Sequence, residues 1–358
     1  MKEMILQGSV RDSRIRIGGG LLDHMPALAM EELQPQRVCV VTDSHVAPLY
    51  LERVEVGFRQ AGAQVGHHIL PAGEEHKQLS SVEAIYQTLH QQGLTRSDLV
   101  VALGGGVVGD ITGFAAGTYL RGVKLIQVPT TLLAQVDSSV GGKCGVDLPQ
   151  GKNLVGMFNQ PHQVYIDTEV LDTLPEGIFA DGMAEVIKYG CIWDASLLEL
   201  TKGGQARRHM EELVTRCVDC KRQVVEQDEN DTGLRMILNF GHTVGHGVEK
   251  VAQFTQVTHG QGVAIGMVAA MKLGETAGIT PSGLHRQLAD WLEEYGLPTQ
   301  LPYSVEQVFE AMLSDKKKQG DAIRFVFAEK PGQVCVRPVP VEELRRLMHQ
   351  ALDQTGKE

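Results

Sequence analysis

Short apolar runs alternate with segments of helical periodicity over the first half of the chain. The runs 37–43 (RVCVVTD), 99–103 (LVVAL) and 123–131 (VKLIQVPTT) are rich in β-branched side chains, as buried strands usually are. Between them, residues 81–93 (SVEAIYQTLHQQG) place apolar side chains at helical spacing and end in a glycine. Strands that alternate with helices form parallel βαβ units, so the sequence predicts an α/β domain over residues 1–180.

The pattern changes after residue 180, where helical spacing dominates. One exception is residues 322–339, which are predicted to form a short hairpin around Pro331 and Gly332. We therefore predict a Rossmann-like parallel-sheet domain followed by a mainly α-helical domain over residues 181–358, with the active site in the cleft between them. The segments with helical spacing are 181–201, 206–228, 234–251, 261–278, 284–295, 305–314 and 341–353.

The net charge and the composition of the chain argue against nucleic acid and membranes as binding partners. The 358 residues include 33 Lys and Arg against 44 Asp and Glu, a net charge of −11, which provides no electrostatic footprint for nucleic acid or an anionic membrane. The longest apolar run, 263–271, is about half as long as a membrane-spanning helix requires, and the N-terminus lacks the pattern of a signal peptide. Six scattered cysteines indicate free thiols. We expect a cytoplasmic protein with a small-molecule ligand.

A glycine-rich turn follows one of the predicted strands. Gly104, Gly105 and Gly106 let the backbone approach a ligand closely, and a helix that begins near Val107 offers its N–H groups to phosphate oxygens. The pattern G-x-G-x-x-G fits Gly104, Gly106 and Gly109 in the strand–turn–helix context that dinucleotide binding requires. A tight turn without a ligand is the less favoured alternative.

Two further segments carry groups that suit a nucleotide. Asp43 ends an earlier predicted strand, where its carboxylate can accept hydrogen bonds from the hydroxyls of an adenosine ribose. The polar segment 73–77 (GEEHK) offers Glu74 and Lys77 as contacts of the ribose or the adenine. Taken singly, each of these charges is more often an ordinary loop residue.

Residues 134–156 are rich in glycine and small polar residues. The segment places Asp137, Lys143, Lys152 and Asn153 in what we predict to be one irregular region. Lysine side chains on a glycine-rich backbone suit phosphate binding because they act as mobile point charges. In an acidic chain, such a segment indicates a local anion site.

The second half offers ligands for a metal ion. His242 and His246 are four residues apart, which places both rings on one face of a helix. Glu185 is a third ligand of the type that catalytic zinc prefers, and His259 begins a later helix. Spacing alone favours Glu185, His242 and His246, and it leaves the pair of His242 with His259 open.

Seven ordered motifs resemble the 3-dehydroquinate synthase family of sugar-phosphate cyclases over about residues 43–318. The resemblance implies Zn²⁺, with Co²⁺ as an alternative, held by Glu185, His242 and His259. His246 is then expected near the substrate phosphate. The motifs are GEEHK, GGGVVGD, PTTLLAQVDSSVGGKCGVDLPQGKN, AEVIKYG, LRMILNFGHTVGHGVE, HGQGVAIGM and DKKK.

The resemblance also implies a reaction in the shikimate pathway of aromatic amino acid biosynthesis. The substrate is 3-deoxy-D-arabino-heptulosonate 7-phosphate, and the products are 3-dehydroquinate and phosphate. The family uses NAD⁺ for a transient oxidation, which permits β-elimination of phosphate, re-reduction and an intramolecular aldol closure. A homodimer is implied, because Arg121 resembles an arginine that reaches the neighbouring subunit's site.

Residue roles follow from the same motifs. Asp137 and Lys188 are expected at the substrate hydroxyls, and Lys221, Arg235 and Asn239 at the carboxylate. The groups expected around the phosphate are Lys143, Lys152, Asn153, His246 and one of Lys316 or Lys317. The residues implied around NAD⁺ are Asp43, Gly73, Glu74, Lys77, Gly104, Gly105, Gly106, Val107, Val108, Gly109, Asp110, Thr130, Thr131, Lys143, Lys152 and Thr173.

Two positions depart from the family pattern. Gln261 stands where many members carry Glu, and we expect a change beside His259 that alters the orientation of its ring. Cys144 stands where Thr is usual. Rival interpretations are another sugar-phosphate cyclase, a metal- and NAD-dependent polyol dehydrogenase and a non-catalytic nucleotide-binding protein. A dehydrogenase has no need of the anion contacts at Lys143, Lys221 and Arg235.

Overall fold

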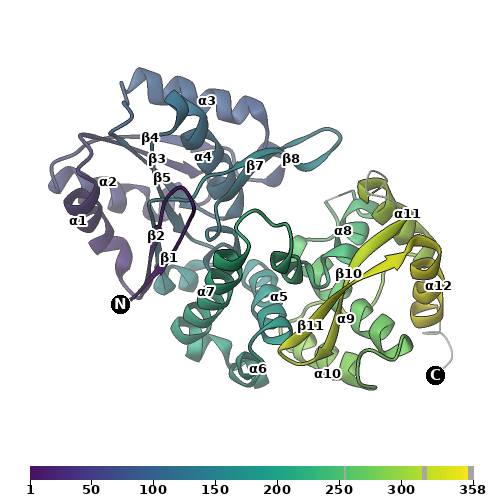
Figure 1. Cartoon of the computed structure of the whole chain (residues 1–358). Helices are drawn as coiled ribbons and strands as arrows, with labels where there is room; N and C mark the ends of the chain where they lie inside the picture. The colour runs from purple at the N-terminus through teal and green to yellow at the C-terminus, as the bar shows by residue number, and fades with distance from the viewer. Residues whose placement is uncertain (254, 317–320, 354–358) are drawn as a thin grey trace. The chain divides into compact units, whose positions relative to one another are not determined.

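A computed structural model describes residues 1–253, 255–316 and 321–353, without the side chains of 314–316. The chain forms two compact units (Figure 1). Unit 1 comprises Met1–Pro175 and Lys221–Asn230, and unit 2 comprises Glu176–Cys220 and Asp231–Glu358. The units are therefore interleaved along the chain, whereas the boundary at residue 180 assumed two consecutive segments. That boundary stays a prediction.

Unit 1 is built on a seven-stranded sheet with the order β1-β2-β9-β6-β5-β3-β4. The pairing is parallel throughout except between β1 and β2, so the predicted parallel α/β architecture is confirmed. The strands are β1 (Lys2–Leu6), β2 (Ser13–Gly18), β3 (Arg37–Asp43), β4 (Gln64–Leu70), β5 (Leu99–Gly104), β6 (Lys124–Pro129) and β9 (Gln163–Asp167).

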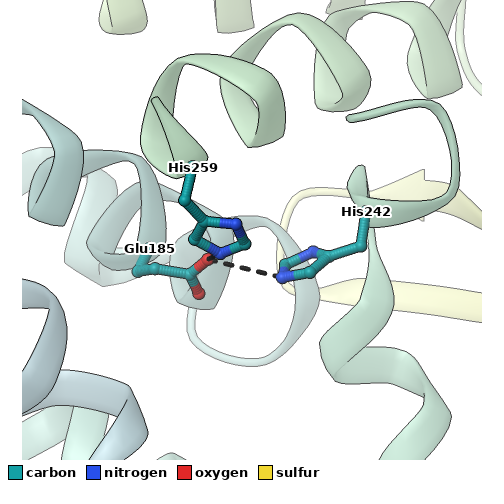
Figure 2. Close-up of side chains that lie close together, drawn as sticks. All are labelled: Glu185, His242 and His259. Atoms are coloured by element: carbon teal, nitrogen blue, oxygen red, sulfur yellow. Dashed lines mark ion pairs between the residues drawn. The ribbon is translucent and has the colours of Figure 1, made fainter. Parts of the chain in front are cut away.

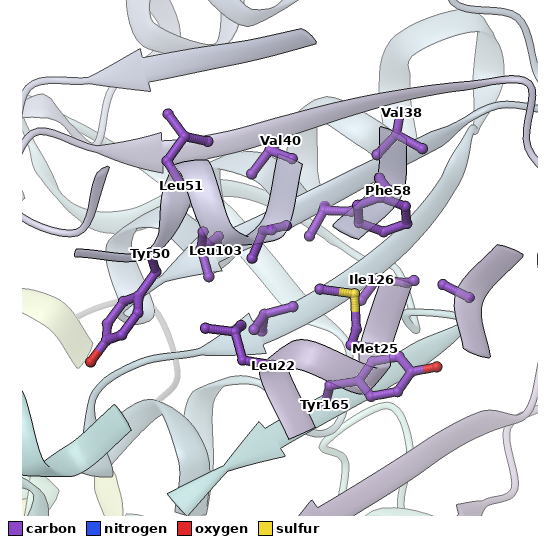
Figure 3. Packing of buried hydrophobic residues seen from close by; sticks show 14 of the residues in the cluster. Leu22, Met25, Val38, Val40, Tyr50, Leu51, Phe58, Leu103, Ile126 and Tyr165 are labelled. Atoms are coloured by element: carbon purple, nitrogen blue, oxygen red, sulfur yellow. The ribbon is translucent and has the colours of Figure 1, made fainter. Parts of the chain in front are cut away.

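Alternate residues of β3 belong to different cores. Val38 and Val40 pack in one cluster with Met25 and Phe58 (Figure 3), whereas Cys39 belongs to a second cluster with the helices α3 and α4. Both faces of the strand are buried, which explains its continuous apolar run. The helical elements of unit 1 are α1 (Leu21–Leu33), η1 (Ala47–Leu51), α2 (Glu52–Gln60), η2 (Glu74–His76), α3 (Leu79–Gln91), α4 (Gly106–Thr118), η3 (Tyr119–Arg121), η4 (Ala134–Ser138) and η5 (Thr168–Thr173).

The segment predicted to be irregular contains a two-stranded hairpin, so that prediction was wrong. Strands β7 (Lys143–Leu148) and β8 (Gly151–Phe158) pair in antiparallel register. Gly145 makes the close approach possible, because a Cβ there would lie 2.5 Å from the carbonyl oxygen of Val155. The sequence signal was weak because glycines replace the apolar residues that usually mark a strand.

Unit 1 contains a partly buried histidine whose pKa is lowered on folding. His162 precedes β9, and its Nδ1 accepts hydrogen bonds from the backbone N–H of Leu125 (3.2 Å) and from Arg11 (3.1 Å). Burial, aided by the charges of Arg11 and Lys124, lowers the pKa of His162 from 6.5 to about 4. The unfolded state therefore binds more protons between these pH values. The contribution of His162 to the free energy of unfolding is complete above pH 6.5 and is lost as the pH falls toward 4.

We expect His162→Gln to flatten the acid dependence of stability. In the parent protein, the shift accounts for about 3 kcal/mol of unfolding free energy lost on acidification. Urea denaturation at several pH values between 4 and 7 measures this loss, with the exposed His24→Gln as the matched control. Equal pH slopes in the parent and in His162→Gln would contradict the assignment.

Unit 2 is mainly helical, and within the described residues no helix is long and apolar enough to cross a membrane. The predicted hairpin is present as β10 and β11. The segment predicted as one helix over 234–251 divides at Gly241, whose φ of 80° ends the helical path. The elements are α5 (Glu176–Ile192), α6 (Ser196–Thr201), η6 (Lys202–His209), α7 (Met210–Gln227), η7 (Leu234–Asn239), α8 (His242–Val251), α9 (His259–Thr276), α10 (Leu284–Glu293), α11 (Val305–Lys316), β10 (Ala322–Lys330), β11 (Gln333–Pro340) and α12 (Val341–Leu352).

Candidate metal and nucleotide sites

Glu185, His242 and His259 converge in unit 2 from three different helices (Figure 2). Oε1 of Glu185 lies 3.6 Å from Nε2 of His242 and 3.7 Å from Nε2 of His259. Ligand atoms that bind one tetrahedral zinc at about 2.0–2.1 Å lie about 3.3–3.4 Å apart. The two separations therefore fit a single ion after a small inward movement, and the His₂Glu donor set is one that catalytic zinc uses.

Glycines allow the helices that carry these ligands to pack closely. A Cβ on Gly266 of α9 would overlap the carbonyl oxygen of Gly241 and lie 2.8 Å from the backbone nitrogen of Gly245 on α8. A Cβ on Gly245 would lie 2.7 Å from the carbonyl oxygen of Gly262. Because each contact is with backbone, no side-chain movement can relieve it. The glycines thus determine how closely α8 and α9 approach.

The first turn of α9 is fixed by a capping box. The backbone N–H of Thr258 donates to Oε1 of Gln261 (3.1 Å), and the N–H of Gln261 donates to Oγ1 of Thr258 (3.4 Å). Thr258 also donates to Asp181 of α5 (2.6 Å). Glutamine completes such a box as glutamate does. The departure at Gln261 therefore keeps the helix start that carries His259, and an altered orientation of that ring stays a prediction.

Lys188 shares the carboxylate of Glu185 with the two histidines. Its Nζ contacts Oε2 of Glu185, while Oε1 of the same carboxylate faces the rings of His242 and His259. Burial and the Lys188 charge lower the pKa of His242 well below its ordinary value. Burial also opposes protonation of His259, but hydrogen bonds to Glu185 and Glu249 outweigh it and raise its pKa to about 10. A metal ion at this group therefore replaces a proton on His259.

His246 lies beside this group and is exposed. Its ring centroid is 5.4 Å from that of His242 and 6.1 Å from that of His259. Among the described residues, no metal-type group combines His246 with Glu185, but a second group combines His246, Glu249 and His259. Sequence reasoning missed Glu249, although its position seven residues after His242 places both on one helix face.

The glycine-rich turn in unit 1 has the geometry of a phosphate-binding turn. Strand β5 ends at Gly104, and α4 begins at Gly106, one residue before the predicted start. Gly105 caps the helix without a side-chain hydrogen bond, which leaves the first turn accessible to an anion. Gly109 has a different role, because a Cβ there would lie 2.9 Å from Oε1 of Gln127 on β6. It permits close packing of helix and sheet. Val107 and Val108 follow in the first turn of α4.

Three motifs of the sequence meet around Lys77. Its Nζ is 2.6 Å from Oδ2 of Asp110 and 2.6 Å from Oδ1 of Asn153. Burial disfavours its charge, but the carboxylates of Asp110 and Glu74 outweigh burial and raise the pKa of Lys77. Nζ of Lys152 lies 3.3 Å from Oε1 of Glu74. The structure thus brings together five residues that were assigned separately to nucleotide or phosphate binding.

Lys221 and Asp137 form a second ion pair in unit 1, in which the lysine is buried. Nζ of Lys221 is 2.7 Å from Oδ1 of Asp137 and 2.6 Å from its carbonyl oxygen. Lys221 is only 5% exposed, so it is not a solvated residue on the surface of its helix. The pairing joins α7 to the π-helical turn η4.

The remaining predicted residues lie at several places. The N–H of Thr130 donates to the carbonyl oxygen of Gly104. The hydroxyl oxygen of Thr131 accepts a hydrogen bond from the N–H of Ala134 at the start of the following turn. Asp43 accepts from the N–H groups of His45 and Val46, a turn role that the sequence reasoning did not include. In unit 1, Gly73 precedes η2, Lys143 begins β7, Arg121 is exposed, and the hydroxyl of Thr173 forms hydrogen bonds with Val170 and Tyr50. In unit 2, Arg235 is buried, Asn239 ends η7, and Lys316 ends α11. Lys317 lies outside the described residues.

Cys144, the second departure, is buried on β7. Its thiol donates to the carbonyl oxygen of Met157 on β8 at 3.4 Å, which a threonine hydroxyl can also do. Burial raises the pKa of the Cys144 thiol to about 12, so it stays protonated. The residue therefore acts in the hairpin rather than as a nucleophile.

Comparisons with known proteins agree over most of the chain. The family described as 3-dehydroquinate synthase N-terminal matches residues 67–181, and 3-dehydroquinate synthase C-terminal matches residues 182–318. A 3-dehydroquinate synthase of Streptococcus pneumoniae serotype 19F (strain G54) is 44% identical over 337 residues, 92% of this chain and 95% of the relative.

Two solved structures share the fold over nearly the whole length. One is 2-deoxy-scyllo-inosose synthase complexed with carbaglucose-6-phosphate, NAD⁺ and Co²⁺, with 25% identity, a TM-score of 0.88, and coverage of 98% of this chain and all of the other. The other is 2-epi-5-epi-valiolone synthase from Streptomyces hygroscopicus subsp. jinggangensis 5008 with NAD⁺ and Zn²⁺, with 24% identity, a TM-score of 0.85, and coverage of 98% and 99%. On the family matches and the 44% identity, the chain belongs to the 3-dehydroquinate synthase family.

Proposed function

We propose that this chain converts 3-deoxy-D-arabino-heptulosonate 7-phosphate to 3-dehydroquinate and phosphate. The observation that carries the proposal is the 44% identity to a 3-dehydroquinate synthase over 92% of the chain. Its net reaction is redox-neutral, so a nicotinamide cofactor acts catalytically and is regenerated. The three converging ligands in unit 2 and the phosphate-binding turn in unit 1 are the two groups that such chemistry needs.

We propose Glu185, His242 and His259 as the residues that hold a divalent ion, Zn²⁺ or Co²⁺. When bound there, such an ion supplies Lewis acidity to a substrate hydroxyl. Lys188 contacts Oε2 of Glu185 and is assigned to the substrate hydroxyls. His246, which is exposed next to the group, is assigned to the substrate phosphate.

NAD⁺ is proposed to bind with its phosphates at the turn Gly104–Gly106 and at the first turn of α4. When bound, it supplies a reversible hydride acceptor. Lys77 forms an ion pair with Asp110 of α4 and a hydrogen bond with Asn153, and Lys152 forms an ion pair with Glu74. Such a paired network keeps the lysines oriented without leaving unpaired buried charge.

We propose the anion contacts of the substrate from the resemblance to the family. Lys221, oriented by Asp137, and Arg235 are assigned to the carboxylate, with Asn239 beside them. Lys143, Lys152, Asn153 and one of Lys316 or Lys317 are assigned to the phosphate. Lys221 is assigned by its spacing from the segment NFGHT, and the other residues stand within the family motifs.

We propose a homodimer in which Arg121 reaches the site of the other subunit. Leu120 and Arg121 both have positive φ, 51° and 65°, and both are exposed, a strained conformation that suggests a functional loop. If Arg121 acts across subunits, mixing the inactive variants Arg121→Ala and Lys188→Ala restores activity, because one site of each mixed dimer is complete. No gain on mixing would exclude this role. A cytoplasmic location stays a prediction.

The experiment that tests the function follows inorganic phosphate and NADH together. It uses the purified protein with Zn²⁺, the heptulosonate phosphate and NAD⁺ well below the substrate concentration. We expect phosphate far in excess of NAD⁺ and no lasting NADH. NADH that grows with turnover, without phosphate, indicates a polyol dehydrogenase and contradicts the proposal. Release of phosphate only from an aldohexose phosphate indicates another sugar-phosphate cyclase.

A further inference from the structure

Glu249 is a buried carboxylate to which no step above gives a role. It lies on α8, seven residues after His242, and is 2% exposed. Its Oε1 is 3.1 Å from Nδ1 of His259, a hydrogen-bond distance. The buried side chain therefore contacts a proposed metal ligand from the side opposite to the metal group.

The two nitrogens of His259 face different carboxylates. Nε2 lies 3.7 Å from Oε1 of Glu185, and Nδ1 lies against Glu249. A carboxylate that accepts the Nδ1–H proton fixes the tautomer whose Nε2 lone pair is available to a metal ion. It also holds the plane of the ring, because the hydrogen bond is directional.

Packing keeps Glu249 in this position. A Cβ on Gly262 of α9 would lie 3.0 Å from both Cγ and Oε1 of Glu249, so the carboxylate rests against the backbone of the helix that begins at His259. The capping box of Thr258 and Gln261 fixes the backbone at the same helix start. His259 is thus restrained both through its backbone and through its ring.

We infer that Glu249 is a positioning residue that orients His259 for metal binding through its Nδ1–H. The inference rests on the proposed function only in taking His259 as a metal ligand. A rival interpretation arises because His246, Glu249 and His259 also lie close enough to bind an ion themselves. An ion held by Glu249 would occupy the carboxylate that our inference assigns to the Nδ1–H of His259, so the two interpretations differ in metal stoichiometry.

The test measures the affinity of the metal-free protein for Zn²⁺ by competition with a chromophoric chelator. We expect Glu249→Ala to lose about 10–100-fold in affinity. Glu249→Gln keeps a carbonyl acceptor at the same distance and should recover most of the loss. The Co²⁺ absorption spectrum should change in Glu249→Ala, because a freed ring alters the ligand geometry. Excess metal should restore much of the kcat.

The matched control is Glu275→Ala on the same unit. Oε2 of Glu275 on α9 is 2.8 Å from Nδ1 of His285 on α10, a partly buried carboxylate–histidine pair that is not part of the metal group. Its loss should lower stability and leave zinc affinity and the Co²⁺ spectrum unchanged. If Glu249→Ala fails to fold, Glu249→Asp withdraws the carboxylate from Nδ1 and carries the same expectation.

Two results overturn the inference. One is zinc affinity and a Co²⁺ spectrum in the Glu249 variants that match the parent. The other is two bound ions per parent chain, one of which is lost in Glu249→Ala. The proposed function is tested separately, because a parent protein that binds zinc tightly but releases no phosphate fails as a cyclase while the role of Glu249 stands.

Discussion

Glu185→Gln is expected to abolish turnover while it also destabilises the chain. The substitution keeps the size of the side chain and removes its negative charge. The metal group then loses its only carboxylate ligand among Glu185, His242 and His259. Lewis acidity contributes several kcal/mol to such a reaction, so the expected loss of kcat/KM is at least about 10³-fold.

The destabilisation has a separate cause. Glu185 is fully buried, Lys188 is 1% exposed, and the two are paired. Removing one partner leaves a buried charge without its counterion, which typically costs about 3–5 kcal/mol. The matched control is Glu176→Gln at the start of the same helix. Glu176 pairs with Arg207 at 2.7 Å but is itself 83% exposed, so the expected change is below about 1 kcal/mol.

Phosphate release, zinc content and urea denaturation separate these effects. We expect Glu185→Gln to lose activity and zinc affinity together, and excess zinc should not restore full turnover. Activity within tenfold of the parent with normal zinc content would remove Glu185 from the metal group. If activity is lost while zinc affinity is unchanged, Glu185 acts only by orienting Lys188 and does not bind the metal ion.

Gly266→Ala is expected to disrupt the packing of α8 against α9. The added Cβ overlaps the carbonyl oxygen of Gly241 and approaches the nitrogen of Gly245 to 2.8 Å. Since both contacts are with backbone, the helices must separate. Overpacking of this kind costs about 1–3 kcal/mol or more. The separation also moves His242 away from His259, so zinc affinity should fall in the fraction of protein that remains folded.

Gly177→Ala is the control for this prediction. Gly177 lies in the first turn of α5, and a Cβ there would meet nothing within 4 Å. Because alanine is the better helix former, we expect a neutral or slightly stabilising effect, up to about 1 kcal/mol. Urea denaturation gives the free energies of unfolding, and metal analysis of the folded fraction gives the zinc content. Parent-like values for both in Gly266→Ala would show that the close approach of the helices is unnecessary.

Local sequence was sufficient for the parts of this protein that depend on periodicity. The β-branched runs of β3, β5 and β6 predicted buried parallel strands because side chains alternate between two covered faces. The glycine turn after β5 predicted a phosphate-type helix start, and α4 begins within one residue of the expected position. The types of metal ligand were also evident, because few residue types bind zinc.

Weak local signals limited the prediction elsewhere. The hairpin β7–β8 was missed because Gly145 and Gly156 replace strand-forming residues where two backbones pass closely. Gly241 was included within a helix because its positive φ leaves no mark on the hydrophobic pattern. In both places, contacts with distant backbone require the glycine, and such contacts are invisible to a local pattern.

Which histidine faces Glu185 was decided by tertiary structure. The i, i+4 spacing made His246 as good a partner for His242 as His259, because a helical face is all that spacing determines. The approach of α8 and α9, set by backbone contacts at Gly241, Gly245, Gly262 and Gly266, brings His259 to Glu185 and Glu249 to His259. The sequence by itself determined the elements and the chemical types of the ligands. Convergence of side chains from separate helices depends on interhelical distance, which only the packed structure defines.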